Sequence, residues 1–125
     1  MKKKITLIIG LLCSGKTTLL NTLNGINIDD IDSLNQLPNV LNNNLNITSH
    51  FIFKEVREKA ISILKEKYDK NIFIDLIFFE NNIKKCLKNL EKRGDEETKK
   101  VKNFIVNFSQ FYNIPSQSKI YKIKT

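Results

Sequence analysis

A segment bracketed by glycines limits what this chain can fold into more than any other part of its sequence. An apolar, β-branched run at residues 5–9 leads into Gly10-Leu-Leu-Cys-Ser-Gly-Lys-Thr-Thr18, and leucines at helical spacing follow. The pattern predicts a strand, a loop and a helix over residues 16–23. Such a loop directs backbone amide groups and a helix N-terminus toward one point. The sequence therefore predicts a phosphate-binding loop.

The residues of this loop suit a nucleoside triphosphate. Gly10 allows a sharp turn after the strand, and Gly15 lets the backbone approach the phosphates closely. Lys16 is expected to reach the β- and γ-phosphates, and the Thr17 hydroxyl to bind the Mg²⁺ that a nucleotide carries. A glycine-rich turn between core elements would explain the glycines but not the Lys16-Thr17 pair. The expected nucleotide-binding residues are Gly10, Cys13, Ser14, Gly15, Lys16, Thr17 and Thr18.

Length and composition indicate a single domain over residues 1–125. A hydrophobic content of 41% is enough to fill one core. The formal net charge of +8 would suit a nucleic acid or an anionic metabolite as partner, although the lysines are scattered along the chain. No run approaches the roughly 18 apolar residues of a membrane span. The two cysteines have neither metal-site nor disulfide spacing, so a cytoplasmic protein with reduced thiols is expected.

Two acids follow a short alternation of apolar and polar residues at 26–30. The alternation predicts a second strand, with Asp29 and Asp30 at its carboxyl end. Ligands of open parallel sheets bind at the carboxyl ends of the strands, so both acids are expected beside the phosphate loop. A carboxylate there can accept a proton from an attacking hydroxyl or hold water around a metal ion. A turn rich in aspartate after a strand is the alternative interpretation.

The middle of the chain carries weaker signals. Val40-Leu41 is predicted to form a third strand that ends at Asn42-Asn43-Asn44, where neutral amides replace a metal-organising acid. Residues 51–67 have the pattern of an amphipathic helix, capped by Thr48 or Ser49, with Arg57 on its exposed side. His50 is expected at the surface or as a cap. The expected buried stripe of this helix comprises Ile52, Val56, Ala60, Ile63 and Leu64.

The remaining residues predict one strand, two helices and a final strand. Residues 71–79 are almost continuously apolar, which is typical of a central strand covered on both faces. Residues 81–93 form an amphipathic pattern with Cys86 on its apolar side, and residues 120–123 alternate as a last strand. A second helix is expected to open at Asp95. Its apolar face would comprise Val101, Phe104, Ile105, Phe108 and Phe111.

The junction between these two helices resembles a lid. Arg93 and Gly94 interrupt the helical pattern, so a small helical lid is expected around residues 91–98. A glycine hinge that carries an arginine can close over a bound nucleotide.

Several segments together resemble one family, over most of the chain. They are Gly10-Leu-Leu-Cys-Ser-Gly-Lys-Thr-Thr18, Ile28-Asp-Asp30, Phe78-Phe-Glu-Asn-Asn82, Cys86, Asn89, Arg93 and Tyr112-Asn-Ile-Pro115. With them the chain resembles the small phosphate-loop kinases that are common in bacteriophages. These kinases are related to the kinase domain of phage polynucleotide kinase, to zeta-toxin and to nucleotide kinases.

The resemblance implies a three-layer P-loop NTPase fold of the α/β class, with about five parallel strands flanked by helices. It also implies ATP and Mg²⁺ as cofactors, and transfer of the γ-phosphate of ATP to a nucleic acid 5′-hydroxyl, a nucleoside or a nucleotide. Lys16, Asp29 and Arg93 would be the catalytic residues, with Asp29 as general base and Arg93 as lid arginine. The cytoplasm of a bacterial or phage-infected cell would be the location.

Two departures from the family pattern leave an alternative open. Polynucleotide kinase has an arginine three residues after its catalytic acid, where this chain has Asp32, and the asparagines at 42–44 replace the third-strand acid. Both would suit a catalytically weak ATP-binding module with a regulatory or interaction role. A GTPase is less favoured, because no Asn-Lys-x-Asp motif is present.

Overall fold

Two strongly apolar strands lie inside a five-stranded sheet, which belongs to a computed structural model that describes residues 3–49, 51–94 and 98–125. Every neighbouring pair is parallel, in the order β2-β3-β1-β4-β5. The predicted α/β class with about five parallel strands is confirmed. The strands are β1 (Lys4–Ile9), β2 (Ile26–Ile28), β3 (Leu45–Thr48), β4 (Phe73–Phe79) and β5 (Ile120–Tyr121).

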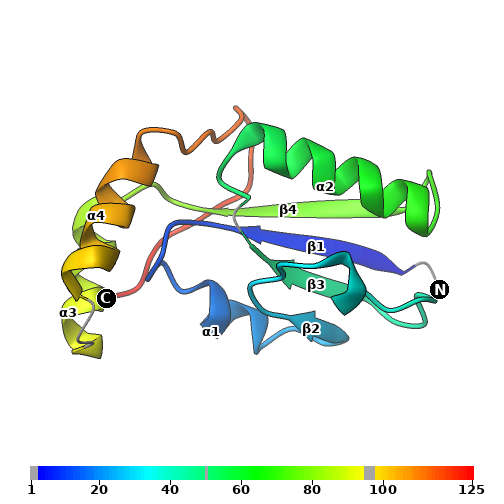
Figure 1. Ribbon diagram of the computed structural model, residues 1–125, viewed down its shortest axis with the longest axis horizontal. Helices are drawn as coiled ribbons and strands as arrows, with labels where there is room; N and C mark the ends of the chain where they lie inside the picture. The colour runs from blue at the N-terminus through cyan, green and yellow to red at the C-terminus, as the bar shows by residue number, and fades with distance from the viewer. Residues whose placement is uncertain (1–2, 50, 95–97) are drawn as a thin grey trace.

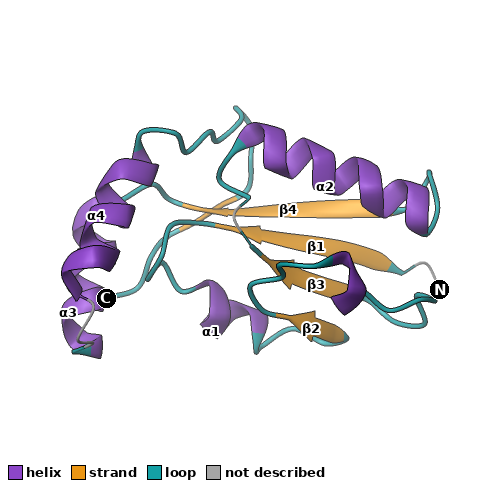
Figure 2. Ribbon diagram, in the orientation of Figure 1, coloured by secondary structure: helices purple, strands orange, loops and turns teal. Residues whose placement is uncertain are grey.

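Four α-helices accompany the sheet. They are α1 (Lys16–Leu20), α2 (Lys54–Lys67), α3 (Ile83–Arg93) and α4 (Thr98–Ser109), and a short 3₁₀-helix, η1, spans Leu34–Gln36. Figure 1 shows α2 alongside β4, α1 beside the β2–β3 part of the sheet, and α3 with α4 beyond the carboxyl ends of the strands. Figure 2 shows the same arrangement by type of element. Among the described residues, no helix has the length and apolar character that a bilayer crossing requires.

The central strand β1 supplies much of the core, because both of its faces are covered. Four of its apolar side chains are completely buried, and Ile8 pairs with Thr48 of β3 while Ile9 pairs with Phe78 of β4. The hydroxyl of Tyr112 lies within hydrogen-bond distance of the carbonyl oxygens of Ile9 and Phe79, so it joins the ends of β1 and β4. The loops after the strands consequently gather at one edge of the sheet.

The third strand lies later in the sequence than predicted. Val40-Leu41 is not a strand, and Asn42-Asn43-Asn44 precedes β3 instead of ending it. The Asn44 side-chain oxygen accepts a hydrogen bond from the Lys4 amide at the amino end of β1. These asparagines therefore lie away from the glycine-rich loop, which follows the carboxyl end of β1. The third strand was misplaced because every residue of β3, from Leu45 to Thr48, is buried, including polar ones. The buried Asn46 side-chain amide donates hydrogen bonds to the Asn24 carbonyl and to the Asn27 side-chain oxygen. The asparagines therefore do not occupy the position at the end of the third strand where a metal-organising acid would lie.

The helix predicted at residues 51–67 begins at Lys54, and the expected cap is wrong. Thr48 belongs to β3, the Ser49 hydroxyl donates to the Ile31 carbonyl, and the N-cap is Phe53, with no side-chain cap. His50 lies outside the described residues. The chain therefore makes an extra turn before α2 starts.

The buried side of α2 also differs from the prediction. Val56, expected inside, is 42% exposed, whereas Arg57, expected outside, is 3% exposed. The Arg57 guanidinium donates to the Phe51 carbonyl at 3.0 Å and to the carbonyl and side-chain oxygens of Asn113 at 3.1 and 2.8 Å. It also lies 5.0 Å from the centre of the Phe78 ring. Hydrogen bonds to three oxygens compensate the burial of this charge, which an apolar stripe cannot reveal.

The other elements are close to expectation. The first helix ends at Leu20 instead of residue 23, because Thr22 and Leu23 bond the carbonyls three residues back. β4, α3 and buried Cys86 agree with the prediction, and burial raises the pKa of the Cys86 thiol to about 12. Pairing in the last strand covers only Ile120–Tyr121. The expected helix start at Asp95 lies outside the described residues, and α4 is described from Thr98.

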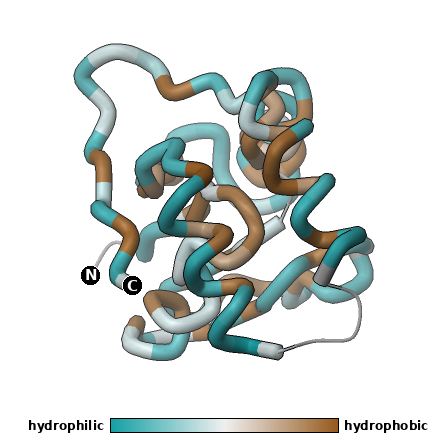
Figure 3. Tube along the Cα trace, turned by 90° about the vertical axis from the view of Figure 1, so that its left-hand side faces the viewer, coloured by the Kyte–Doolittle hydropathy of each residue, from teal (hydrophilic) through white to brown (hydrophobic). Residues whose placement is uncertain are grey.

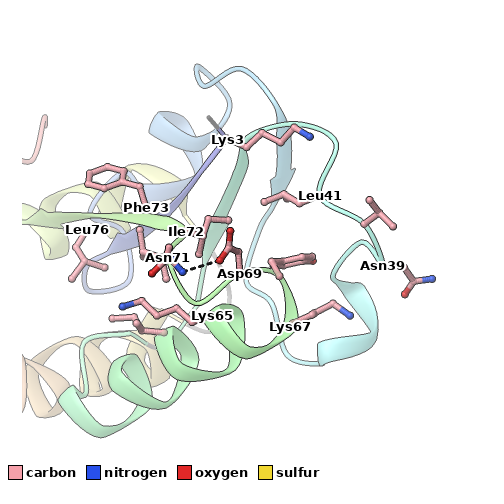
Figure 4. A pocket seen from close by; sticks show the side chains of 14 residues that line it. Lys3, Asn39, Leu41, Lys65, Lys67, Asp69, Asn71, Ile72, Phe73 and Leu76 are labelled. Atoms are coloured by element: carbon pink, nitrogen blue, oxygen red, sulfur yellow. Dashed lines mark hydrogen bonds between the residues drawn. The ribbon is translucent and has the colours of Figure 1, made fainter. Parts of the chain in front are cut away.

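A hollow of about 1140 Å³ lies at the amino ends of β1 and β4. Figure 4 shows its lining of lysine and apolar side chains, with Asp69 accepting the amide of Asn71 at 3.0 Å. Ligands of parallel sheets bind at the opposite ends of the strands. A functional site is therefore expected at the carboxyl edge of the sheet.

The Arg57 contacts predict a large loss of stability in Arg57→Met, which keeps the length of the side chain but leaves the carbonyls of Phe51 and Asn113 unpaired. We expect the free energy of unfolding in urea to fall by on the order of 3 kcal/mol. The exposed Lys59 of the same helix offers the control, because Lys59→Met should change it by less than about 0.5 kcal/mol. Equal stability of the two variants would contradict this role of Arg57.

Candidate nucleotide-binding cleft

The carboxyl edge of the sheet holds a cleft of about 810 Å³. The chain leaves β1 toward β2 and β3 on one side, and leaves β4 toward β5 on the other. The loops after β1 and β4 therefore diverge, which is the position where open parallel sheets bind ligands. The loop after β1, residues 10–15, forms the floor of this cleft together with the start of α1.

Two glycines of the loop are required by its geometry. A Cβ atom on Gly10 would lie 2.5 Å from the Ser14 hydroxyl oxygen and 3.1 Å from the Cβ of Phe79, so any other residue would force these side chains to move. Gly15, directly before α1, has a φ of 107°, in the region that favours glycine. Cys13 also has a positive φ, of 64°. The loop is therefore tightly wound, as a cradle of backbone amides must be.

Ser14 is the least satisfied polar residue of this loop. It is 1% exposed, and its hydroxyl has no hydrogen-bond partner among the described residues, although its amide bonds the Leu11 carbonyl at 3.2 Å. A buried polar atom without a partner is rare, and one that lines a cleft points to a ligand.

Lys16 contributes a positive charge inside the loop. Its ammonium group donates to the Gly10 carbonyl at 2.9 Å. Burial lowers its pKa below the ordinary lysine value, and the carboxylates of Asp30 and Asp29 partly offset this effect. The charge is thus poorly hydrated, and an anion in the loop would compensate it.

Asp29 links the start of α1 to the end of β3. One of its carboxylate oxygens accepts the Thr17 hydroxyl at 3.0 Å, and the other accepts the Thr48 hydroxyl at 2.6 Å. Thr48 ends β3, whose carboxyl end lies between those of β1 and β2. The expected metal-binding hydroxyl and the expected acid are therefore in direct contact.

Asp30 lies beside this pair in a different environment. Its amide donates to the Thr48 hydroxyl at 2.6 Å, and its φ of 51° is unusual for a residue other than glycine. Asp30 lines the cleft, as Asp29 does, and its carboxylate accepts no hydrogen bond within the described part of the chain. The two adjacent carboxylates thus differ, because only that of Asp29 is held by two hydroxyls.

One wall of the cleft consists of α3 and the end of the chain. The Asn89 amide donates to the carbonyls of Cys13 and Lys124, at 3.0 and 2.9 Å. Arg93, in the last turn of α3, donates to the Cys13 sulfur at 3.3 Å. The lid expected at 91–98 stays a prediction, since residues 95–97 are outside the described residues.

A second part of the cleft lining is apolar and aromatic. Ile52, Phe104 and Phe108 line the cleft there. The rings of Phe104 and Phe108 are stacked, with centroids 5.4 Å apart, and Phe108 meets Phe53 edge to face at 5.5 Å. Figure 3 looks at the side that carries α3 and α4, where hydrophobic and hydrophilic segments alternate along the helices.

The structure brings all residues of the sequence-based site together. Each residue expected to bind the nucleotide or to act in catalysis lines this one cleft, including Asp29 and Arg93. The sequence analysis missed three parts of the cleft. They are the Thr48 hydroxyl that bonds Asp29, the Asn89 side chain that bonds the Cys13 carbonyl, and the aromatic wall formed by Phe104 and Phe108. No family model and no curated protein matches the sequence.

Glu80, directly after β4, holds the end of the chain in place. It accepts the Lys85 ammonium at 2.9 Å, the Ile123 amide at 2.7 Å and the Asn82 side-chain amide at 3.2 Å. The hydrogen bond from Lys85 and that from Ile123 lower the pKa of Glu80 to about 2. This carboxylate thereby fixes the wall that contacts Cys13.

The depressed pKa of Glu80 predicts a specific acid sensitivity. Between about pH 4.5 and pH 2 the unfolded chain binds the proton more readily than the folded one, so the stability contributed by Glu80 is present above this range and lost within it. Glu80→Gln should be less stable at pH 7 and lose less stability on acidification, as measured by thermal unfolding. The exposed Glu66→Gln variant is the control. Parallel curves for native protein and Glu80→Gln would contradict the prediction.

Proposed function

We propose that this protein is an ATP-dependent kinase with a three-layer P-loop NTPase fold, which transfers the γ-phosphate of ATP to an acceptor hydroxyl. The observation that carries the proposal is the hydrogen bond between Thr17 and Asp29, because it joins the expected metal-binding hydroxyl to an acid from another strand. A glycine-rich structural turn would not need this contact. The parallel sheet with its glycine loop after the central strand further supports the proposal.

The residues of the loop fit a nucleotide and its magnesium ion. The Ser14 hydroxyl is buried without a partner, and the Lys16 ammonium is poorly hydrated, so both gain from an anion in the loop. Thr17 and Asp29 would hold Mg²⁺, the acid through water, since Mg²⁺ prefers oxygen ligands and keeps several waters. When bound, the ion offsets charge on the phosphates.

The cationic residues have distinct tasks in this proposal. Lys16 stabilises the negative charge that develops on the transferred group, and its bond to the Gly10 carbonyl keeps it within the loop. Arg93, on α3, contacts the same loop by donating a hydrogen bond to the Cys13 sulfur. An arginine at such a position can contribute on the order of a thousandfold or more to the rate.

The two aspartates divide the remaining tasks. Asp29 already accepts two hydroxyls, one of them from Thr17, which favours a role in positioning the metal over the role of general base. Asp30 lines the cleft with a carboxylate that accepts no hydrogen bond within the described residues. We therefore assign the acceptor proton to Asp30: the acceptor oxygen bonds to the γ-phosphorus, the bond from that phosphorus to the bridging oxygen breaks, ADP leaves, and the proton moves to Asp30.

The direct test follows labelled γ-phosphate from ATP, with magnesium, onto 5′-hydroxyl oligonucleotides, nucleosides and nucleoside monophosphates. Native protein should label at least one class, and Lys16→Ala should abolish both labelling and ATP binding. Lys59→Ala on the exposed side of α2 should behave as native protein. ATP binding without any transfer would favour the regulatory module, and ATP binding that does not depend on Lys16 would contradict the proposal.

The division between the aspartates makes a second prediction. Asp29→Asn should raise the magnesium concentration needed for half-maximal turnover, whereas Asp30→Asn should lower kcat on the order of a hundredfold without changing the magnesium dependence. Steady-state kinetics over a magnesium titration measure both effects. A loss of turnover in Asp29→Asn that excess magnesium does not restore would return the base role to Asp29.

A further inference from the structure

The outer edge of β4 is only partly paired. β5 pairs with the last two residues of β4, so residues 73–77 have a neighbouring strand on the β1 side alone. The Phe78 amide donates to the Lys119 carbonyl, so Phe78 directs its backbone groups toward β5. Because this direction alternates along a strand, Ile74 and Leu76 direct theirs toward the same edge. Among the described residues, no hydrogen bond reaches these outward groups.

This free edge borders the hollow at the amino ends of β1 and β4. Ile74 and Leu76 both line the hollow, together with Ile61 and Lys65 of α2. Figure 4 shows Leu76 on the same side of β4 as Lys65, and Phe73 on the other side. Backbone groups that can pair with another strand therefore lie beside an apolar surface. Proteins recognise extended peptides in this way, with affinity from backbone hydrogen bonds and specificity from alternate side chains.

The hollow is open to solvent. Val40 and Phe73 line it, although they are 66% and 61% exposed. Pockets for small molecules enclose most of the surface of their ligand. Exposed apolar side chains that adjoin one another instead mark the sites where proteins meet. The hollow therefore suits the side chains of a peptide better than a free apolar molecule.

The charges around the hollow select among such partners. The lysines that line it are Lys3, Lys65 and Lys67. Its one acid, Asp69, accepts the Asn71 amide at 3.0 Å, and Asp75 of β4 does not line it. A second copy of the chain, with a net charge of +8, would bring two such cationic surfaces together. An acidic partner is complementary to this surface.

We propose that the free edge of β4 and the adjoining hollow bind an extended segment of a partner protein as an added strand. The backbone of this segment pairs with Ile74 and Leu76, its alternate apolar side chains enter the hollow, and acidic residues flank them. This inference goes beyond the proposed kinase function and does not depend on it.

The first test measures hydrogen exchange of backbone amides by NMR. The probe is the peptide Glu-Glu-Val-Thr-Val-Thr-Val-Glu-Glu with both ends blocked. In the free protein the amides of Ile74 and Leu76 should exchange faster than those of Asp75 and Ile77, which face β1. Saturation with the peptide should slow exchange at Ile74 and Leu76 at least about tenfold. Unchanged exchange at these two amides in the saturated protein would overturn the inference.

Peptide variants, compared by calorimetry, test the backbone pairing and the charge. One variant is N-methylated at its valines and another at its threonines. Only one of the two should lose binding, because just one of these sets of amides faces β4 in a paired strand. A peptide with lysines in place of the glutamates should bind at least about tenfold more weakly. Equal binding of both methylated peptides, or of the acidic and basic peptides, would contradict strand addition by an acidic segment.

Variants of the protein locate the binding surface. Lys65→Glu combined with Lys67→Glu should weaken the acidic peptide about tenfold, whereas Lys59→Glu, on the same helix but away from the hollow, should change binding less than about twofold. Phe73→Ser should also weaken binding. Phe111→Ser is its control, because Phe111 is 60% exposed and does not line the hollow. Loss of binding in the controls alone would place the peptide elsewhere.

The remaining outcomes identify other occupants and separate this inference from the kinase proposal. An oligothymidylate that displaces the peptide and protects the same amides would identify a nucleic acid site and overturn the inference. Protection that rises with protein concentration in the absence of peptide would identify a second copy, with the same consequence. Lys16→Ala should leave peptide binding unchanged, because Lys16 lies at the opposite edge of the sheet. Failure of phosphate transfer would therefore leave this inference intact.

Discussion

The carboxylate of Asp29 is the interaction on which the arrangement of the cleft depends. It accepts one hydroxyl from the first turn of α1 and another from the end of β3, while its own residue follows β2. Three segments that are separate in the sequence are thereby fixed to one another. The parallel sheet brings their ends to the same edge, and the hydrogen bonds set the relative positions of the side chains there. The residues of each segment are close together in the sequence, and the two hydrogen bonds to Asp29 bring the segments together.

The sequence predicted what is encoded locally. The glycine-rich loop depends on residues within eight positions of one another: Gly15 has a positive φ, and a Cβ atom on Gly10 would meet the side chains of Ser14 and Phe79. The position of Asp29 followed from a general property of parallel sheets. The third strand was misplaced because a buried strand containing asparagine and threonine has no apolar alternation to recognise. Asn46 and Thr48 are tolerated in the core because partners distant in sequence satisfy them.

The same limitation explains Arg57 and the aromatic wall. An arginine on a helix reads as exposed unless its acceptors are known, and one of these, Asn113, lies 56 residues away. The sequence analysis placed Phe104, Phe108 and Phe111 on one apolar helix face, but Phe104 is 38% exposed, and Phe111 lies beyond the end of α4 and is 60% exposed. The sequence also could not show that Phe104 and Phe108 border a cleft. Which side of a site is apolar and which is cationic emerges only when the crossovers have placed the helices. The composition of the cleft lining is therefore a property of the topology.

The two cysteines experience opposite environments within one small fold. Cys86 is completely buried in α3, and its pKa is raised to about 12, so its thiolate is not available at neutral pH. Cys13 is partly exposed in the tightly wound loop, with its sulfur against Arg93. The chain thus carries one accessible thiol at the floor of the cleft and one protected thiol. A maleimide fluorophore would attach to a single, known position, and it would report on the cleft without any engineered cysteine.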